Sequence, residues 1–290
     1  MRFTKVILVG SGKIACDCLR YMITIVAIKD IVVLESQNNQ LSMLANVCKK
    51  ENISYSVLEN KKDIEQFMLA HVENERTLIV SANNRFIFTP QIIQKEYVEI
   101  INFHYALLPR YRGMNIPTWV IYNGEKETGI TWHFVTEQVD KGKIIAQRTI
   151  PINDMTNALE VTRKGMLLGI EAFESFIAEL LDNKMDGMDV LYPEEDVIYY
   201  NSQLPMAGVI DLNQSIEDIS RLLRSFDYGG MKVIPYLRLY YNNNCYEVQR
   251  YKLRKLSTVK KRMIEYKEDT VFVKDVDGEI ELYLKPFRND

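Results

Sequence analysis

An amide and an imidazole stand two residues apart in the segment INFHYALLPRYRG, where Asn102 is followed by His104. The apolar run before them predicts a strand, and alternate residues of a strand point to the same side of its sheet. Both side chains are therefore expected on one side, at the end of that strand. An amide donates hydrogen bonds and an imidazole titrates near neutral pH, so this pair has the groups needed to bind and to move a proton. A carboxylate, Asp140, follows in the polar turn TEQVDKG.

The elements that must hold these residues alternate between strand and helix patterns. Short apolar runs separated by segments of helical period predict a mostly parallel α/β sheet with crossover helices. Ligands of such open sheets bind beyond the carboxyl ends of the strands, where Asn102 and His104 are expected. The predicted strands are 6–9, 31–34, 53–57, 77–81 and 98–103, and the predicted helices are 14–23, 41–50, 62–71 and 90–95.

The pattern changes after residue 125 and again after residue 204. Two β-rich segments precede a long helix and a polar linker, and the last part of the chain combines one short helix with further β-rich segments. We therefore predict an α/β domain over 1–190 and a small β-rich domain over 204–290. The expected elements are strands at 128–135 and 143–152, helices at 157–181 and 215–226, a linker at 182–196, strands at 232–241 and 245–253, and a hairpin at 270–286.

The composition is that of a soluble globular protein. The 290 residues are 47% hydrophobic and 26% charged, and the net charge of -3 provides no strong attraction for nucleic acid. The cysteines have no metal-binding or redox spacing, so we expect buried thiols and no metal site. No signal peptide precedes the first strand, and charges interrupt the longest apolar stretch. We expect a cytoplasmic protein without a membrane segment.

Four features of the central segment together resemble a known enzyme family. They are Asn102 with His104, the Leu108-Pro109 turn, Arg112-Gly113, and Asp140 with Gly142. The combination is similar to the signature of enzymes that transfer a formyl group from N10-formyltetrahydrofolate to an amine. That family includes methionyl-tRNA, glycinamide ribonucleotide and amino-sugar N-formyltransferases. The resemblance covers roughly residues 1–185, and it implies the Rossmann-like formyltransferase fold followed by an OB-like C-terminal domain.

The resemblance also implies a catalytic role for each residue. When an amine attacks the formyl carbon, a tetrahedral oxyanion forms, and Asn102 and His104 would stabilise its charge. His104 would return a proton to the leaving folate nitrogen. Asp140 would hold the imidazole in its charged form and help to take the proton from the attacking amine. No covalent nucleophile is required.

The resemblance places the formyl donor and the acceptor around this set. Relatives hold the pterin through the backbone of two loops, although Phe88-Thr89-Pro90 departs from their usual aliphatic pattern. The implied donor-binding residues are Phe86, Ile87, Phe88, Thr89, Thr136, Val139 and Asp140. The implied acceptor-binding residues are Ser11, Gly12, Lys13, Tyr105, Arg112 and Asn115, of which Asn115 could instead cap a helix.

The opening segment KVILVGSGKIACD supports two interpretations. Gly10-Ser11-Gly12 follows a strand and opens a helix, and Glu35 lies where a ribose-binding carboxylate would stand. This favours an NAD(P)-binding oxidoreductase as an alternative, but the chain offers no separate acid or base for hydride transfer. In the formyltransferase interpretation, Ser11 to Lys13 face a phosphate of the acceptor at the helix N-terminus, and a purely structural turn is the rival. A catalytically inactive binding module is a third alternative.

The acceptor is expected to be a nucleotide-linked amino sugar, as in cell-surface polysaccharide synthesis. A transfer-RNA substrate would favour a basic C-terminal domain, yet residues 201–290 sum to only +2. The glycinamide branch normally lacks a C-terminal β domain. Methionyl-tRNA remains the alternative acceptor, and a homodimer is possible. Trp119, Trp132 and Tyr228 could pack on sugar or base, with core packing favoured for Trp132. Structural roles are favoured for His71 and His133.

Overall fold

The chain forms two compact units, each assembled from several stretches of sequence. The computed structural model describes residues 3–26, 30–36, 42–72, 75–182, 184–193, 197–255 and 259–287. Unit 1 is composed of Met1–Gly113, Thr128–Ile150 and Arg163–Ile198. Unit 2 is composed of Met114–Glu127, Pro151–Thr162 and Tyr199–Asp290. Two short segments from the first 190 residues therefore group with the C-terminal part of the chain.

A seven-stranded sheet with the order β3-β2-β1-β4-β5-β7-β8 forms the centre of unit 1. Its strands are β1 (Lys5–Gly10), β2 (Ile31–Glu35), β3 (Ser54–Val57), β4 (Thr77–Ala82), β5 (Val98–His104), β7 (Glu127–Phe134) and β8 (Ile144–Pro151). Neighbouring strands from β3 to β5 are parallel, and β7 is antiparallel to β5. The predicted mostly parallel, Rossmann-like sheet is confirmed.

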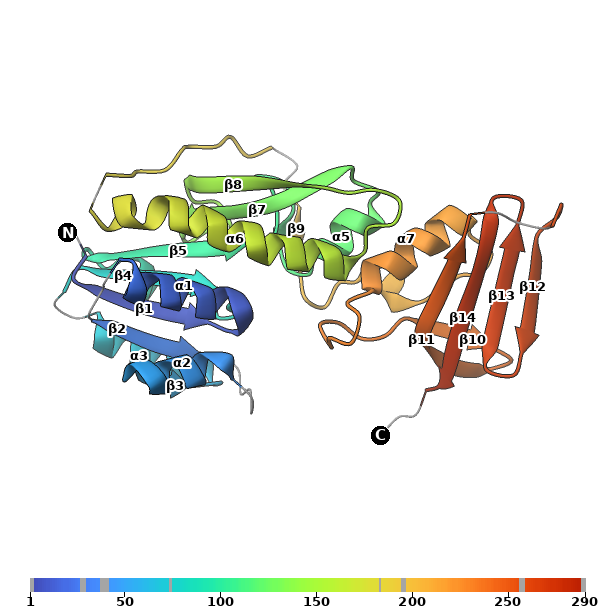
Figure 1. Cartoon of the computed structure of the whole chain (residues 1–290), viewed down its shortest axis with the longest axis horizontal. Helices are drawn as coiled ribbons and strands as arrows, with labels where there is room; N and C mark the ends of the chain where they lie inside the picture. The colour runs from blue at the N-terminus through green and yellow to red at the C-terminus, as the bar shows by residue number, and fades with distance from the viewer. Residues whose placement is uncertain are drawn as a thin grey trace. The chain divides into compact units, whose positions relative to one another are not determined.

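Helices pack on both faces of this sheet, as its almost uninterrupted apolar strands require. They are α1 (Gly12–Thr24), α2 (Met43–Glu51), α3 (Lys61–His71), α4 (Pro90–Ile93) and α6 (Ala158–Leu181). Val6 and Leu8 of β1 belong to a core shared with α1, α2 and α6, whereas Ile7 and Val9 belong to a core shared with α3 and α4. Figure 1 shows α1 and α6 passing over the strands of unit 1.

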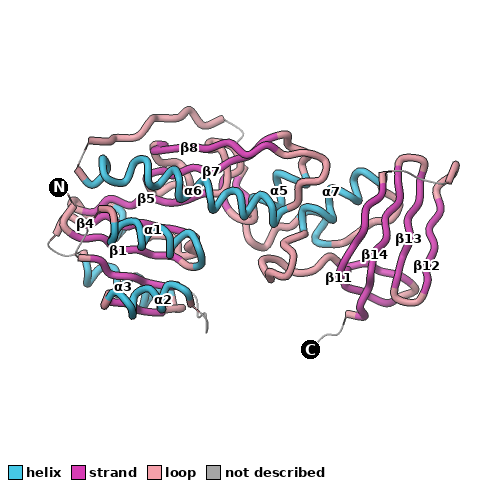
Figure 2. Tube along the Cα trace, in the orientation of Figure 1, coloured by secondary structure: helices cyan, strands magenta, loops and turns pink. Residues whose placement is uncertain are grey.

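Unit 2 contains a five-stranded antiparallel sheet with the order β10-β11-β14-β13-β12. Its strands are β10 (Arg238–Tyr241), β11 (Asn244–Arg254), β12 (Met263–Lys267), β13 (Thr270–Asp275) and β14 (Gly278–Pro286). Figure 2 shows β11, β14, β13 and β12 side by side. The predicted hairpin over 270–286 is confirmed as β13 and β14.

The helix predicted over 215–226 is confirmed as α7 (Ile216–Phe226), which begins where the Ser215 hydroxyl accepts a hydrogen bond from the Asp218 N–H. Its apolar side chains, Ile219 and Leu222 among them, pack in the core of unit 2. The remaining elements are α5 (Ile116–Tyr122), the 3-10 helix η1 (Pro205–Gly208), and the short strands β6 (Arg112–Gly113) and β9 (Ile198–Tyr199), which pair in a two-stranded sheet.

Two predictions for unit 2 were wrong in detail. The strand expected over 232–241 is shortened to β10, and the lost part contains Pro235, which has no N–H to donate to a neighbouring strand. Strand β12, a short edge strand with the sequence MIEYK, was not predicted, because its two charged residues interrupt the apolar ones. Residue 41 of a predicted helix and residues 183 and 194–196 of the predicted linker lie outside the described residues.

Three of the thiols, those of Cys16, Cys18 and Cys48, are buried as expected, whereas Cys245 is half-buried. Burial raises the pKa of Cys16 and Cys48 to about 11, so neither is suited to act as a thiolate nucleophile. Within the described part of the chain, no helix is long and apolar enough to span a bilayer. No group of three or more His, Cys, Asp or Glu side chains among those same residues could hold a metal ion.

Candidate active site

The register of three neighbouring strands brings the predicted catalytic residues together in unit 1. Ser81 of β4 lies beside Asn102 of β5, and Asn102 lies opposite His133 of β7. His104 ends β5, so the amide and the imidazole both reach its carboxyl end. The expectation that these two side chains share one end of the strand agrees with this placement.

The Asn102 amide is oriented by contacts on both of its sides. Its Oδ1 accepts a hydrogen bond from the Ser81 hydroxyl at 2.7 Å, and its Nδ2 lies 3.2 Å from His133 Nε2. The Ser81 side chain is buried, so this hydrogen bond is shielded from water. The amide therefore presents its N–H groups in a fixed direction.

The His104 ring has an acceptor opposite each nitrogen. Its Nε2 lies 2.7 Å from the carbonyl oxygen of Tyr111, and its Nδ1 lies 3.7 Å from Asp140 Oδ2. The residue is buried, with 6% of its surface exposed. A proton on either nitrogen thus faces an oxygen, and the distance to Asp140 exceeds that of a direct hydrogen bond.

Asp140 is held in an unusual backbone conformation with its carboxylate turned inward. Its φ of 55° lies in the left-handed region. Oδ2 accepts a hydrogen bond from the Gly113 N–H at 2.8 Å, and Oδ1 lies 3.5 Å from His133 Nε2. Burial raises the pKa of this carboxyl, but His104, His133 and the Gly113 N–H outweigh burial and hold it well below its usual range. The carboxylate is therefore ionised at neutral pH.

The glycine two residues after Asp140, Gly142, is required by close packing against β7. A Cβ at this position would lie 1.7 Å from the carbonyl oxygen of Phe134, so only glycine permits this approach of the turn to β7. The Leu108-Pro109 bond in the loop after β5 is cis, and the Leu108 N–H donates to the Thr131 hydroxyl at 3.2 Å. Both loops that flank the catalytic set are thus tied to β7.

His133 is a residue of this site that sequence reasoning missed. It is buried, as expected, but its Nε2 also contacts Asn102 and Asp140 while its Nδ1 lies 2.8 Å from the carbonyl oxygen of Phe134. Only the pairing of β5 with β7, which places His133 opposite Asn102, could have identified this residue. The sequence does not show the register of that pairing.

A family model described as "Formyl transferase" matches residues 20–176, which is more than half of the chain and includes Asn102, His104 and Asp140. The chain belongs to the formyl transferase family. The expected family membership and the expected fold class are confirmed.

Several curated proteins are similar in sequence to this formyl transferase. GDP-perosamine N-formyltransferase of Brucella melitensis is 29% identical over 224 residues, which cover 77% of this chain and 84% of that protein. Methionyl-tRNA formyltransferase of Thermodesulfovibrio yellowstonii is 37% identical over 140 residues, 46% of this chain and 44% of that protein. Bifunctional polymyxin resistance protein ArnA of Wigglesworthia glossinidia brevipalpis is 31% identical over 160 residues, 55% of this chain and 24% of that protein. The chain thus spans less than half of the last two.

Two solved structures share the fold over almost the whole chain. An N-formyltransferase from Helicobacter canadensis, in complex with folinic acid and dTDP-3-aminofucose, has a TM-score of 0.73 at 18% identity and covers 97% of this chain and 99% of that one. WlaRD, a sugar 3N-formyl transferase studied with dTDP and 5-N-formyl-THF, has a TM-score of 0.72 at 19% identity, with 97% of each chain covered. At this identity the likeness establishes the fold.

The residues expected at the donor site of this formyl transferase occupy two different environments. Phe86 and Phe88 are buried in the core with α3 and α4, whereas Ile87 is 66% exposed. The side chain of Asn84 occupies both the N–H and the carbonyl of Phe86, and the Thr89 hydroxyl donates to Glu65. In the described part of the chain, the main-chain groups of Ile87 and Phe88 make no hydrogen bond, which leaves them available.

The second donor loop, which precedes and includes Asp140, is partly exposed. The Thr136 hydroxyl donates to the carbonyl of Gln138 at 3.1 Å, and Val139 exposes 38% of its surface. Val139 therefore offers an exposed apolar side chain in the residue that precedes Asp140.

Five of the residues expected at the acceptor site, Ser11, Gly12, Lys13, Tyr105 and Arg112, belong to unit 1. Ser11 bonds with Asn83, and the Lys13 ammonium pairs with Asp17 at 2.5 Å, so that the exposed start of α1 is already partly neutralised. Tyr105 packs edge-on against Phe103 at 4.7 Å. Arg112 is 3% exposed and donates from Nε to the Val139 carbonyl at 2.8 Å, which is a structural contact in this state.

Asn115 belongs to unit 2, in the position that precedes α5, with a φ of 58° and a weak contact to Asn201 at 3.4 Å. Trp119 also lies in unit 2, 4.7 Å from the Tyr199 ring, and the buried Tyr228 hydroxyl contacts the Thr118 hydroxyl at 2.9 Å. Trp132 is fully buried among aromatic rings and donates to the carbonyl of Gly169, so its predicted core role is confirmed.

Glu35 does not have the geometry of a ribose-binding carboxylate. It is fully buried, and its Oε2 accepts hydrogen bonds from Ser42 at 2.5 Å and Tyr55 at 2.7 Å. Gly10 is likewise explained by packing, because a Cβ there would lie 2.0 Å from the Ala82 carbonyl oxygen on β4. Glu35 and Gly10, which suggested a dinucleotide site, are therefore explained by hydrogen bonding and packing within unit 1.

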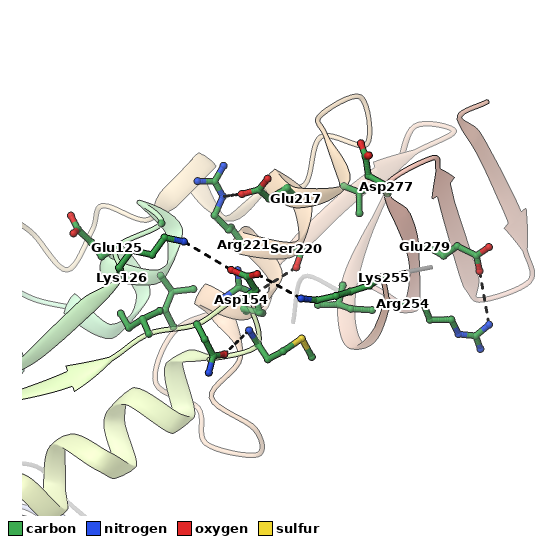
Figure 3. A pocket seen from close by; sticks show the side chains of 18 residues that line it. Glu125, Lys126, Asp154, Glu217, Ser220, Arg221, Arg254, Lys255, Asp277 and Glu279 are labelled. Atoms are coloured by element: carbon green, nitrogen blue, oxygen red, sulfur yellow. Dashed lines mark hydrogen bonds and ion pairs between the residues drawn. The ribbon is translucent and has the colours of Figure 1, made fainter. Parts of the chain in front are cut away.

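A cavity of about 620 Å³ lies within unit 2 and contains none of the predicted site residues. Figure 3 shows Lys126 and Lys255 directed toward Asp154, with Nζ to carboxylate distances of 4.0 and 3.6 Å. Arg254 pairs with Glu279 at 3.9 Å, and Arg221 pairs with Glu217 at 4.0 Å. Most of the charged lining is thus paired internally, which gives this cavity little charge to offer a ligand.

Proposed function

We propose that this chain transfers a formyl group from N10-formyltetrahydrofolate to the amine of a nucleotide-linked amino sugar. The observation that carries the proposal is the convergence of an amide, an imidazole and an ionised carboxylate in unit 1, with His104 Nδ1 3.7 Å from Asp140 Oδ2. Asn102, His104 and Asp140 are proposed as the catalytic set, and the formyl donor is a substrate consumed in each turnover.

The proposed reaction follows from these side chains. The acceptor amine attacks the formyl carbon and forms a C–N bond, so negative charge develops on the formyl oxygen. The Asn102 N–H and a protonated His104 stabilise this charge, and a well-placed donor of this kind contributes about 3 to 4 kcal/mol. The Asp140 carboxylate accepts the proton lost by the amine. His104 then donates a proton to the folate nitrogen as the bond from that nitrogen to the formyl carbon breaks.

The formyl donor is proposed to lie between the two loops that flank the catalytic set. The free main-chain groups of Ile87 and Phe88 fit the hydrogen-bonding edge of a pterin, and Val139 provides apolar contact. Phe86, Thr89 and Thr136 support these loops through their own contacts. The proposal therefore places the reactive nitrogen of the donor near Asp140.

The amino-sugar acceptor is supported by the kind and extent of similarity. GDP-perosamine N-formyltransferase matches over 84% of its length, whereas the methionyl-tRNA enzyme matches over 44%. We assign the acceptor phosphate to Ser11, Gly12 and Lys13 at the start of α1, and contacts with the sugar to Tyr105 and Arg112 of unit 1. The proposal extends to a cytoplasmic enzyme of cell-surface polysaccharide synthesis.

An acceptor panel tests this proposal. The purified chain is incubated with N10-formyltetrahydrofolate and, separately, GDP-, UDP- and dTDP-linked amino sugars, glycinamide ribonucleotide and initiator methionyl-tRNA. Mass spectrometry is expected to detect one added formyl group on a nucleotide-linked amino sugar. A formyl gain on methionyl-tRNA alone would assign the alternative acceptor, and no gain on any amine would refute formyl transfer. The oxidoreductase alternative has no structural support from Glu35, because this carboxylate is buried and accepts hydrogen bonds from Ser42 and Tyr55.

A further inference from the structure

The segment that follows α6 returns to the sheet of unit 1 next to the catalytic turn. Met188 pairs with Ile144 of β8 through reciprocal main-chain hydrogen bonds of 2.7 and 2.8 Å. This bridge anchors the segment four residues before Tyr192. Tyr192 lies outside residues 20–176, the part of the chain that matches the formyl transferase family. The family match therefore assigns no role to Tyr192.

The Tyr192 side chain contacts the turn that carries Asp140. Its hydroxyl donates to the Asp140 carbonyl oxygen at 3.0 Å and lies 3.5 Å from the Gly142 carbonyl oxygen. The Lys141 ammonium is 5.3 Å from the centre of the ring, and the Arg112 guanidinium is 5.8 Å from it. Two cations thus face this aromatic ring, an arrangement that favours one ring position.

The turn needs such contacts because its conformation is unfavourable by itself. Asp140 has a φ of 55°, a conformation that L-residues other than glycine adopt at a cost. Arg112 holds the Val139 carbonyl and Tyr192 holds the Asp140 carbonyl, so two consecutive carbonyls of the turn are each bound by a side chain. If the Asp140 peptide rotated, its carboxylate would leave both imidazoles and the Gly113 N–H.

We infer that Tyr192 is a positioning residue, which holds the Asp140 peptide through its hydroxyl so that the carboxylate faces His104 and His133. This inference rests on the proposed function, because it assigns Tyr192 an effect on formyl transfer through Asp140. Tyr192 is not proposed to touch either substrate. Its loss therefore lowers the rate of the chemical step and leaves substrate binding unchanged.

The test compares Tyr192→Phe with the matched control Tyr97→Phe. Tyr97 also lies beside a guanidinium, that of Arg76 at 5.9 Å, but it precedes the opposite end of β5. Tyr192→Phe is expected to lower kcat about tenfold, the effect of one lost hydrogen bond, with both KM values unchanged and the protein still folded. In the Asp140→Asn background, the same substitution is expected to have no further effect on the residual rate.

A measurement without substrate separates this inference from the proposed function. Carboxyl NMR titration of Asp140 is expected to show a higher pKa in Tyr192→Phe than in the wild type, because the contacts that lower it are weakened. An unchanged titration would overturn the inference even if the wild type transferred no formyl group. A kcat equal to that of the wild type, a change confined to KM, or a full tenfold loss in the Asp140→Asn background would each also overturn it.

Discussion

The carboxylate of Asp140 lies between two imidazole rings, with Oδ2 toward His104 and Oδ1 toward His133. This arrangement gives one carboxylate two neighbours that can each carry a proton. It also accounts for the lowered pKa of Asp140 despite its burial. At the scale of single residues, the site is thus a group of four side chains that includes His133.

The ionisation of Asp140 has a consequence for stability. A carboxyl whose pKa is lowered on folding stabilises the native state above its unfolded pKa, about 3.9, and this stabilisation is lost as pH falls through the folded value. We therefore expect the wild type to lose stability relative to Asp140→Asn as pH decreases below about 4. Urea unfolding of both proteins across this range measures the difference, and a difference independent of pH would contradict the assignment.

His133 is predicted to support the rate through Asn102 and Asp140. In His133→Ala, the Asn102 amide and Asp140 Oδ1 each lose a buried neighbour. Loss of one such contact corresponds to about a tenfold decrease, so kcat is expected to fall at least that far. His71→Ala is the control, since the Nδ1 of this histidine lies 2.7 Å from the Phe67 carbonyl oxygen and its ring packs on the Phe67 ring, both within α3. Equal turnover numbers for the two variants would remove His133 from the site.

At the scale of elements, the sequence predicted the strands but not their partners. The run from Val98 to His104 and the chemistry of its end were recognisable, because apolar strands and the Asn-x-His spacing are local signals. The pairing of β5 with β7 is a long-range contact, so the position of His133 opposite Asn102 was hidden. Arg112 was expected to meet the acceptor, yet in the structure it binds the Val139 carbonyl, a tertiary contact without a local signature.

The donor loop illustrates the same limit. The order of residues identified 86–89 as a loop after β4, but not which of its main-chain groups are free. Asn84 occupies the N–H and carbonyl of Phe86 through its side chain, and this leaves Ile87 and Phe88. Turns formed by Asn side chains compete with ligands for backbone groups, and the sequence alone did not settle that competition.

Substitution of Gly142 tests whether the close approach of the turn to β7 positions Asp140. In Gly142→Ala, the added Cβ would overlap the Phe134 carbonyl oxygen, so the turn must move away from β7 and carry Asp140 with it. A displacement of about 1 Å is expected to reduce kcat roughly 100-fold. Gly230→Ala is the matched control, because nothing lies within 4 Å of the Cβ it would add. Steady-state rates and thermal unfolding are measured for both variants. A Gly142→Ala enzyme with the wild-type kcat would contradict a role for the close packing of Gly142 against β7.

At the scale of the whole molecule, the order of strands and helices was largely recoverable from periodicity. The assignment of 114–127 and 151–162 to unit 2 was not, because tertiary contacts group these segments with the rest of unit 2 and local sequence patterns do not show such contacts. Charge is the global property that bears on the acceptor. Residues 201–290 sum to only +2, so the C-terminal part has little net positive charge to offer a phosphate backbone.

This charge balance predicts weak binding of transfer RNA. Fluorescence anisotropy with labelled initiator transfer RNA is expected to show at most weak binding that salt abolishes, because the positive charges of residues 201–290 are nearly balanced by negative ones. A nucleotide-linked amino sugar in the same buffer is expected to bind and be formylated. Tight, specific binding of the transfer RNA would contradict the proposed acceptor class.

Transfer of an isotopic label tests the central claim most directly. N10-formyltetrahydrofolate labelled with ¹³C in its formyl group is incubated with the nucleotide-linked amino sugar and either the wild type, His104→Ala or Asp140→Asn. We predict that the wild type places the label in a new N-formyl group, and that the rate falls at least about 100-fold in each folded variant. An unlabelled product, or a label transferred by either variant at the wild-type rate, would contradict formyl transfer by this catalytic set.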